Sequence, residues 1–452
     1  MLLQLIEQGQ TAGILLSGGV VPVTGCTYFP RTAEIDPVTG DYLPVEESAE
    51  VILSGTQVQI RATVNAIEQF LRLARVRSQA MEGLRSYVEY RPVDSEAQQR
   101  SELLGGRVEW SDNPGLRRLG ATTPKVKITV IWLRVAAWEG AEVEVRMGSL
   151  ANSGAGVGGR PITNCYDANR GNYLDVPGAA VTGVLPTPAK VLLTNSSAGA
   201  KNYRNFYLAN NWEASPGLWH HTLEGESATS GGTVVNQATI CSGGKYLSGT
   251  FVGESQGIWL PLSASLLQKT AGRRYKLMAR FVGYSSASPI YVRPIVREAE
   301  GVQDVPGGRG EIALLPASTT EWVDLGAIGL PPGGYNTGWA AHTLFLSIRS
   351  ATNAIVNLDF IQVTALDSWR HVVQPGMQIA VGDGVLDDGI LGQAYSVESG
   401  AYHAIVAPRG KPLMLYPGKA QRITINHDQG STYDVTSALT VRMWYRPRRV
   451  TV

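Results

Sequence analysis

Apolar and polar residues alternate along many short stretches of the chain, most clearly close to the C-terminus. Four apolar residues there share one parity: Leu439, Val441, Met443 and Tyr445. The other parity carries four residues with a different character: Thr440, Arg442, Trp444 and Arg446. A period of two is what a half-buried strand requires, so the apolar set is expected to face a core. The outward set contains two arginines and an indole, which makes Arg442, Trp444 and Arg446 candidate residues of a subunit interface.

The same alternation predicts strands in nine places along the sequence: 125–135, 142–147, 190–195, 275–281, 344–348, 355–363, 401–407, 422–426 and 437–446. A helical period occurs once, at about 63–85, where apolar residues recur three or four positions apart. The polar side of this helix is rich in arginine, which fits either a solvated face or a face packed on a neighbouring subunit. A glycine-rich stretch at 148–161 predicts a long loop or a domain boundary.

The composition fits a mainly β protein. The chain has 452 residues, with 51 glycines, 24 prolines and a charged fraction of only 17%, and this length is enough for several domains. We therefore expect several β-sandwich or jelly-roll domains, with one amphipathic helix in the N-terminal domain. The expected segments are an N-terminal β domain at 1–160, a connecting β segment at 161–205, a jelly-roll domain at 206–368 and a C-terminal β domain at 369–452.

Charge and hydropathy exclude several classes of partner. A formal charge of +1 gives no basic footprint, so sequence-specific nucleic-acid binding is not expected. No apolar run approaches the roughly 20 residues that span a bilayer, so no membrane span is expected. The N-terminus lacks the basic start of a signal peptide. The cysteines Cys26, Cys165 and Cys241 are isolated and odd in number, which fits synthesis in a reducing cytosol.

Motifs that carry chemistry are weak. Residues 154–159 satisfy G-x-G-x-x-G, but Pro161 and no amphipathic helix follow, so the motif indicates a loop. Asp383, Asp387 and Asp388 in a glycine-rich turn, or Asp359, are conceivable calcium ligands, although the spacing is not that of an EF-hand.

The pair His220-His221 with Cys241 suggests zinc, but adjacent strand residues point to opposite faces. The sequence contains no H-E-x-x-H, no P-loop and no serine elbow in a strand–turn–helix setting. We therefore expect no enzyme activity, no cofactor and no metal site.

Aromatic residues concentrate in the 206–368 segment. Core packing explains most of them, but exposed rings on a sheet can also stack on sugars because they are amphipathic platforms. Trp259 and Trp322 are the candidate glycan-binding residues.

Several short segments resemble regions of phage distal tail and minor tail proteins. They are Lys-Ile-Thr-Val-Ile-Trp-Leu-Arg at 127–134 with Trp-Glu-Gly at 138–140, and further pieces at 172–177, 183–186, 189–195, 415–418 and 445–448. Separately, the pieces at 275–281, 322–326, 330–331 and 358–361 resemble the jelly-roll domains of carbohydrate-binding modules.

The resemblance implies a homo-oligomeric ring at the tip of a siphophage-like tail, joining the tail tube to the hub or baseplate. The implied partners are other tail proteins (tube, hub and tape measure), with a host-surface glycan as a further ligand. The implied location is the virion tail tip, after synthesis in the host bacterial cytoplasm. Two alternatives stay open: a carbohydrate- or receptor-binding protein that acts through the jelly-roll domain, and a glycan-degrading enzyme.

Overall fold

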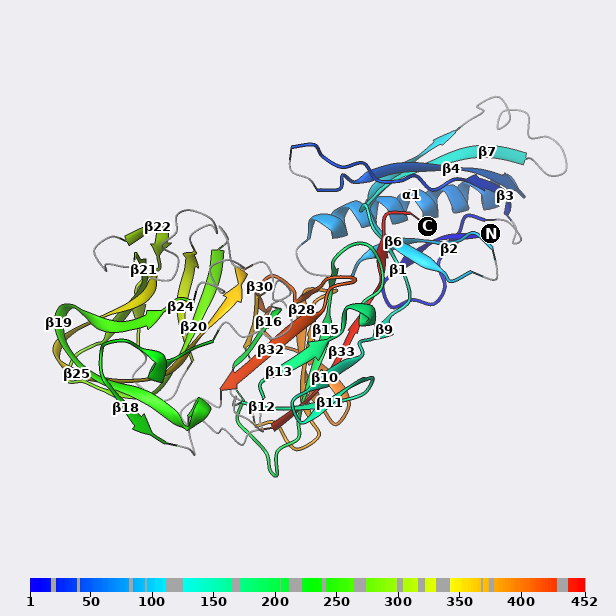
Figure 1. The fold of residues 1–452 in the computed structure, drawn as a ribbon. Helices are drawn as coiled ribbons and strands as arrows, with labels where there is room; N and C mark the ends of the chain where they lie inside the picture. The colour runs from blue at the N-terminus through cyan, green and yellow to red at the C-terminus, as the bar shows by residue number, and fades with distance from the viewer. Residues whose placement is uncertain are drawn as a thin grey trace. The chain divides into compact units, whose positions relative to one another are not determined.

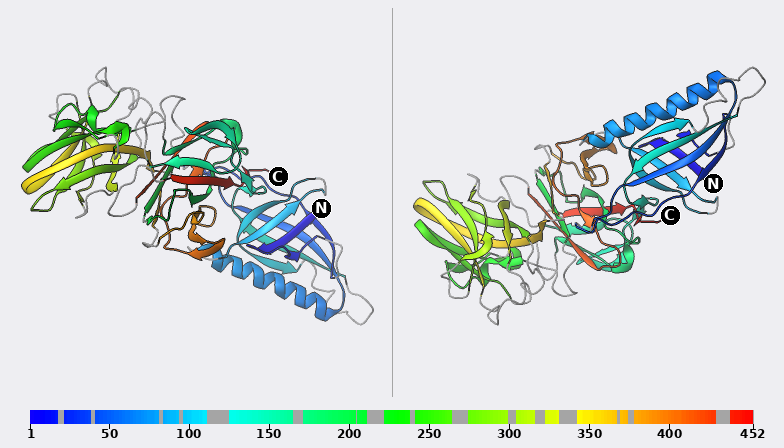
Figure 2. Two further views of the ribbon diagram at one scale, coloured as in Figure 1. Left: turned by 90° about the horizontal axis from the view of Figure 1, so that it is seen from below. Right: turned by 90° about the horizontal axis from the view of Figure 1, so that it is seen from above.

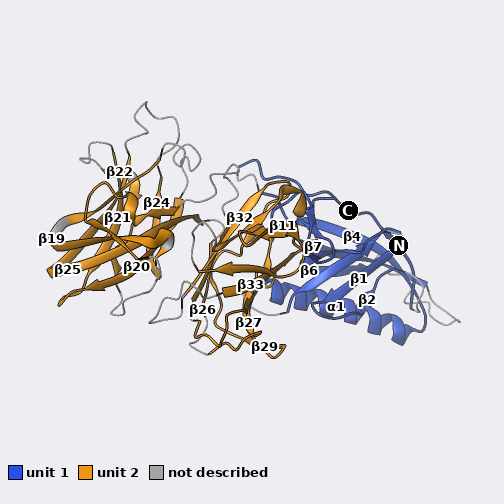
Figure 3. Cartoon of the chain, turned by 60° about the horizontal axis from the view of Figure 1, so that its bottom comes forward, with its two compact units in different colours: residues 1–143, 182–187, 446–452 blue, residues 144–181, 188–445 orange. Residues whose placement is uncertain are grey.

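The computed structural model is mainly β and confirms the fold class expected from the sequence. It describes residues 1–17, 22–38, 41–80, 84–93, 96–110, 125–164, 171–203, 205–210, 222–237, 241–263, 274–298, 304–315, 322–330, 342–366, 369–373, 378–428 and 438–451. Within these ranges there is one α-helix, and the strands form several sheets (Figure 1). The chain divides into two compact units, one made of residues 1–143, 182–187 and 446–452, and the other of residues 144–181 and 188–445 (Figure 3).

The first unit is an antiparallel sheet with a helix packed on it. Its main path follows the order β2-β1-β5-β6-β7-β4-β3, with β8 and β34 attached at the side. The elements are β1 (Leu2–Glu7), β2 (Ile14–Leu15), β3 (Val23–Tyr28), β4 (Val45–Ser54), α1 (Gln57–Gln79), β5 (Ser86–Arg91), β6 (Gln99–Trp110), β7 (Lys125–Arg134), β8 (Trp138–Glu139) and β34 (Arg448–Arg449). Figure 2 shows α1 lying lengthwise along the sheet.

The helix starts six residues earlier than the apolar period predicts and ends at Gln79. The start is set by a capping box: the Thr56 hydroxyl accepts from the Gln59 N–H, and the Gln59 side-chain oxygen accepts from the Thr56 N–H. Such a cap is local chemistry that a search for apolar periodicity does not detect. The residues that α1 buries against the sheet are Ile60, Val64, Ile67, Phe70, Leu71 and Ala74. Neither α1 nor any other helix in the described ranges is long and apolar enough to cross a membrane.

The second unit contains two β-sandwiches. The first sandwich packs two sheets, in the orders β11-β10-β13-β32-β16-β26-β30 and β12-β33-β15-β27-β28-β29, around one apolar core. Its strands are β10 (Met147–Ser149), β11 (Asn152–Gly156), β12 (Arg160–Thr163), β13 (Tyr173–Val176), β15 (Lys190–Asn195), β16 (Asn205–Asn210), β26 (Trp369–Val373), β27 (Gly384–Asp388), β28 (Gln393–Glu398), β29 (Ala401–Ala404), β30 (Arg409–Gly410), β32 (Gln421–Asp428) and β33 (Ala438–Tyr445).

Three further strands of two residues each lie outside the second sandwich: β9 (Val143–Glu144), β14 (Thr187–Pro188) and β31 (Met414–Leu415).

The second sandwich lies within residues 222–365 and has its own core. Its strands are β17 (Thr222–Glu224), β18 (Thr233–Asn236), β19 (Lys245–Pro261), β20 (Arg274–Ser285), β21 (Tyr291–Arg297), β22 (Asp304–Arg309), β23 (Ala313–Leu314), β24 (Trp322–Gly329) and β25 (Thr343–Ala365).

Three local predictions need correction. The glycine-rich stretch at 148–161 is not a long loop, because Asn152–Gly156 forms a hairpin strand against β10 and β12 begins at Arg160. The strands predicted at 344–348 and 355–363 are one continuous strand, β25. The glycine-rich turn predicted around Asp383, Asp387 and Asp388 contains β27, a fully buried strand. In each case pairing with a partner strand, local for β11 and distant for β12, β25 and β27, outweighs the glycine-rich composition.

Candidate functional site

The terminal strand β33 lies inside a sheet of the second unit, with neighbours on both edges. On one edge it pairs with β15, from Lys190 opposite Trp444 to Asn195 opposite Leu439, and on the other edge with β12. The apolar face behaves as the sequence predicts, since Met443 is 0% and Tyr445 1% exposed. The strand therefore offers a neighbouring subunit its outward face and no open edge.

The outward face of β33 carries a small cluster of charge and aromatic surface. Arg442 makes a bidentate pair with Glu144, with 2.9 Å from Nε to Oε1 and 3.0 Å from Nη2 to Oε2. This guanidinium lowers the pKa of the Glu144 carboxyl and lies 4.8 Å from the centre of the Trp444 ring. The structure thus brings Arg442 and Trp444 together, and their role at a subunit interface stays a prediction.

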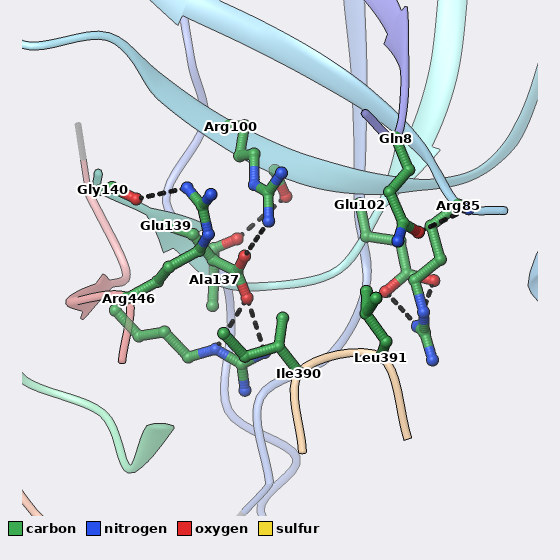
Figure 4. A network of polar contacts seen from close by, with 12 residues as sticks. Gln8, Arg85, Arg100, Glu102, Ala137, Glu139, Gly140, Ile390, Leu391 and Arg446 are labelled. Atoms are coloured by element: carbon green, nitrogen blue, oxygen red, sulfur yellow. Dashed lines mark hydrogen bonds and ion pairs between the residues drawn. The ribbon is translucent and has the colours of Figure 1, made fainter. Parts of the chain in front are cut away.

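Arg446, the third predicted interface residue, belongs to the first unit and to a different cluster. Its Nη1 donates to the Gly140 carbonyl at 3.1 Å, and burial lowers the pKa of its guanidinium (Figure 4). Beside it, Glu139 accepts from Arg448 at 2.6 and 3.0 Å and lies 3.5 Å from Arg100. These contacts fix the C-terminal segment onto the first unit, so a structural role accounts for Arg446.

A hairpin between β3 and β4 projects a set of apolar side chains that sequence reasoning did not single out. We call residues 29–38 and 41–44 the arm. Its two sides are joined by a bridge between Ile35 and Tyr42 and by a bond of 2.8 Å from the Leu43 N–H to the Glu34 carbonyl. Its exposed apolar side chains are Phe29 (79%), Ile35 (54%), Val38 (91%), Tyr42 (36%) and Leu43 (42%). These five exposed apolar residues on one hairpin make the arm a candidate interaction surface.

The base of the arm is fixed by a fully buried ion pair. Arg134 on β7 and Glu47 on β4 lie 2.7 Å apart, and both side chains are 0% exposed. The same two side chains bind the backbone of Arg31, whose N–H donates to Glu47 at 2.8 Å and whose carbonyl accepts from Arg134 at 2.8 Å. The Tyr28 hydroxyl donates to the second Glu47 oxygen at 2.6 Å, and its pKa is raised by burial and by that carboxylate. The arm therefore begins from a rigid base.

The outer side of α1 has the opposite charge to the arm. Its exposed ionisable residues are three arginines and one glutamate: Arg61, Arg72, Arg75 and Glu68. The same helix also exposes the apolar residues Val58 (78%), Val76 (59%) and Leu73 (36%). The arm instead carries three acids and one base: Glu34, Asp36, Asp41 and Arg31. The first unit thus has two apolar surfaces of complementary charge.

The predicted glycan residue Trp259 lines a groove in the second sandwich. The groove encloses about 380 Å³, and its lining residues are Gly231, Gly232, Thr250, Phe251, Gln256, Gly257 and Trp259. The Trp259 ring is half-buried and lies on Phe345, with 4.5 Å between ring centres, while the Arg297 guanidinium lies 5.2 Å from its centre. The structure therefore places this tryptophan beside Phe345 and Arg297, which are distant from it in sequence.

The other predicted glycan residue, Trp322, is 5% exposed. It packs with Tyr207, Ala209, Met278, Phe360 and Trp369 in a small aromatic core. Its ring meets Phe360 edge-on, with 5.1 Å between ring centres. A sugar cannot stack on a ring that is buried on both faces, so only Trp259 is retained as a candidate.

The candidate metal ligands have structural partners. Asp387 receives a bidentate pair from Arg370, with bonds of 2.8 to 3.0 Å, and Asp359 pairs with Arg280 in the interior. Burial nevertheless raises the pKa of Asp387 to about 6, despite the opposing effect of Arg370. Asp388 accepts from the backbone N–H groups of residues 390 and 391, which closes the turn after β27.

The remaining motif residues form no metal or nucleotide site in the ranges that the structure covers. His220 and His221 lie outside the described residues, as does Cys165, whereas Cys241 is a buried cysteine. No group of three or more histidine, cysteine, aspartate or glutamate residues gathers there with the geometry of a metal site. The glycine motif at 154–159 spans the end of β11 and the turn before β12, where no helix N-terminus is available for a phosphate.

Comparisons with known proteins do not assign the chain to a family. No protein-family model matches the chain, and no curated protein matches it. Among solved structures, the chain is similar to the Dit protein of phage SPP1, described as a paradigm of the hub adsorption apparatus in phages that infect Gram-positive bacteria. The similarity covers 80% of this chain and 98% of that chain at 13% identity, with a TM-score of 0.20. Because the TM-score is this low, the likeness carries no argument about fold or function.

Proposed function

We propose that the chain is a structural protein of a phage tail tip, of the distal or minor tail type. It assembles with copies of itself into a ring that joins the tail tube to the hub or baseplate. It acts through surfaces that bind other proteins and does not catalyse a reaction. The proposal rests on the sequence segments that resemble tail proteins and, above all, on the arm.

The arm carries the proposal because it combines exposure with a rigid base. An exposed apolar surface is costly in water unless a partner covers it. Here the surface projects from a backbone that is held by the buried Arg134–Glu47 pair, so little ordering entropy is lost when it binds. A hairpin that is held at its base and exposes apolar side chains between charged ones is suited to docking on another protein.

A second copy of the chain offers the arm a matching surface. The arm has a net charge of −2 from three acids and one base, and the outer side of α1 has +2 from three arginines and one glutamate. Both surfaces also expose apolar side chains, so contact would bury apolar area while opposite charges meet. When the arm of each copy binds the helix of the next copy in one direction, the contact is heterologous, and heterologous contacts close into rings when the rotation per subunit divides a full turn.

The proposal is tested by measuring the mass and shape of the purified protein. Mass photometry over a range of concentrations, followed by negative-stain imaging, should show a closed ring with a central hole. Higher salt should shift the equilibrium toward monomers, because screening weakens contacts between exposed charges. A protein that stays monomeric at high concentration and low salt would overturn the proposed self-assembly.

A further inference from the structure

The groove beside Trp259 has the chemistry of a small, uncharged ligand site. Its lining contains one indole, one amide, one hydroxyl, the Phe251 side chain and three glycines, and none of these residues carries a charge. Its volume of about 380 Å³ falls within the range of small-molecule sites. The positive charge nearest to the indole, the Arg297 guanidinium, is paired with Asp304 at 3.2 Å, which weakens its pull on an anionic ligand. A purely apolar ligand would cover the polar groups without pairing them.

The floor of the groove is backbone. A Cβ on Gly257 would lie 1.9 Å from the Leu346 carbonyl oxygen, and one on Gly232 would lie 2.3 Å from the Ser248 carbonyl oxygen. Gly231 has a φ of +109°, which side chains rarely allow. At these glycines the backbone segments approach one another more closely than any residue with a side chain would permit.

The polar groups of the groove have a defined orientation. The Gln256 Oε1 accepts from the Val252 N–H at 3.0 Å, which assigns its Nε2 amide as the group left to donate. The Trp259 backbone is fixed on its other side, where its N–H donates to the Ser230 carbonyl at 3.0 Å and its carbonyl accepts from the Thr229 N–H at 2.8 Å. The indole is further supported by Phe345. The site is thus ordered before any ligand arrives.

We propose that this groove binds a neutral pyranose of a glycan. The sugar's C–H face would pack on the Trp259 indole, because an aromatic ring offers an apolar face to the alternating C–H groups of the sugar. One sugar hydroxyl would accept from Gln256 Nε2, and another would exchange a hydrogen bond with the Thr250 hydroxyl, which can donate and accept. A neutral sugar matches the groove because it needs an apolar face and uncharged hydrogen-bonding groups at one site.

The test is binding of the full-length protein to saccharides. Saturation-transfer NMR is run with neutral hexose oligosaccharides and with matched uronic-acid oligosaccharides as probes. We expect saturation transfer to the neutral set, and a loss of affinity of about tenfold in Trp259→Ala. Tyr291→Ala is the matched control, since Tyr291 is another exposed ring of the same sandwich, 41% exposed, that does not line this groove. It should bind within about twofold of the unaltered protein.

Further variants keep the proposal open to refutation if Trp259→Ala fails to fold. Gln256 and Thr250 are exposed, so Gln256→Ala and Thr250→Val should leave the melting temperature unchanged and weaken binding of the neutral sugars severalfold. The assignment is overturned by no binding of neutral oligosaccharides at millimolar concentration, by binding of the acidic set alone, or by equal loss in Tyr291→Ala. Ring assembly, measured on the same variants, should be unaffected, so failure of this site leaves the assembly proposal standing.

Discussion

Arg134 and Glu47 form a fully buried ion pair at 2.7 Å, and both side chains also hold the backbone of Arg31 at the base of the arm. One contact between β7 and β4 thus serves both the stability of the first unit and the position of its proposed docking surface. The two roles can be separated, because stability is measured on the monomer and docking on the assembled protein.

Removing one member of this pair should be strongly destabilising. In Glu47→Ala the Arg134 guanidinium remains buried without its carboxylate, and we expect a loss of about 3–5 kcal/mol in the free energy of unfolding. The measurement is urea denaturation followed by circular dichroism. The control is Glu46→Ala on the same strand, because Glu46 is exposed and its contact with Arg107 is 3.8 Å long. That variant should change stability by less than about 1 kcal/mol, and an equal effect of both would refute the argument.

The double variant Ile35→Asp/Val38→Asp should prevent assembly without unfolding the monomer. Both side chains are more than half exposed, so the fold loses little, while charges replace the apolar surface that would be buried in a contact. Mass photometry should show monomers and an unchanged melting temperature. The matched control is Val406→Asp, which introduces a charge at a valine that is 61% exposed and lies outside the arm. If the arm variant still forms rings, the arm is not the docking surface.

Deleting residues 443–452 should abolish cooperative folding of the second unit. The deletion removes Met443 and Tyr445 from the core of the first sandwich, together with the pairing of residues 190 and 191. Removing two large core side chains costs several kcal/mol, a large part of the stability of a domain. Thermal unfolding by calorimetry provides the measurement.

The interface prediction for the outward face of β33 needs a milder change than the deletion. The double variant Arg442→Ala/Trp444→Ala keeps the core intact and should keep the melting temperature within a few degrees. If it also assembles like the unaltered protein, the outward face of β33 makes no subunit contact.

Stability should fall between pH 6.5 and 4, in part because of His371 on β26. Burial, with added repulsion from Arg409, lowers the pKa of this imidazole to about 4 from an ordinary 6.5. Its Nε2 lies 2.8 Å from the Asn205 side-chain oxygen, and its ring stacks on Tyr207. As the pH falls, the unfolded chain therefore binds a proton at this histidine at a higher pH than the folded protein does. The free energy of unfolding is highest above pH 6.5 and decreases as the pH approaches 4.

The size of this effect is roughly 2 kcal/mol, after a discount for the partial exposure of the ring. Other groups titrate in the same window, so the informative quantity is the difference between the unaltered protein and His371→Asn. The pH dependence of the unfolding free energy should be shallower in the variant. Parallel curves for the two proteins would show that His371 is not responsible.

Local patterns predicted much of the fold. The strand at 190–195 and the core-facing residues of β33 follow directly from alternation, because a two-sided strand with one buried face must place apolar residues at every second position. The error at α1 has an equally local cause, since the capping box at Thr56 and Gln59 sets the start of the helix independently of its apolar face.

The candidate sites were predictable only in part. Trp259 and Trp322 were both predicted to be exposed glycan-binding rings, but Trp259 is half-buried beside a groove and Trp322 is buried. The arm escaped notice because Ile35, Val38 and Leu43 look like core residues in the sequence. The structure reveals that they are exposed, because no other described segment covers them.

By itself, the sequence determined that this protein is mainly β, which strand faces enter a core, and that one amphipathic helix is present. These properties depend on side-chain periodicity, and that is a property of neighbouring residues. The tertiary structure alone decided that Arg448 reaches Glu139, that Asp387 meets Arg370, and that Trp259 shares a groove with Gly231. These contacts join residues that are up to about 300 positions apart, and their formation depends on how strands pair across the whole chain, which no local pattern specifies.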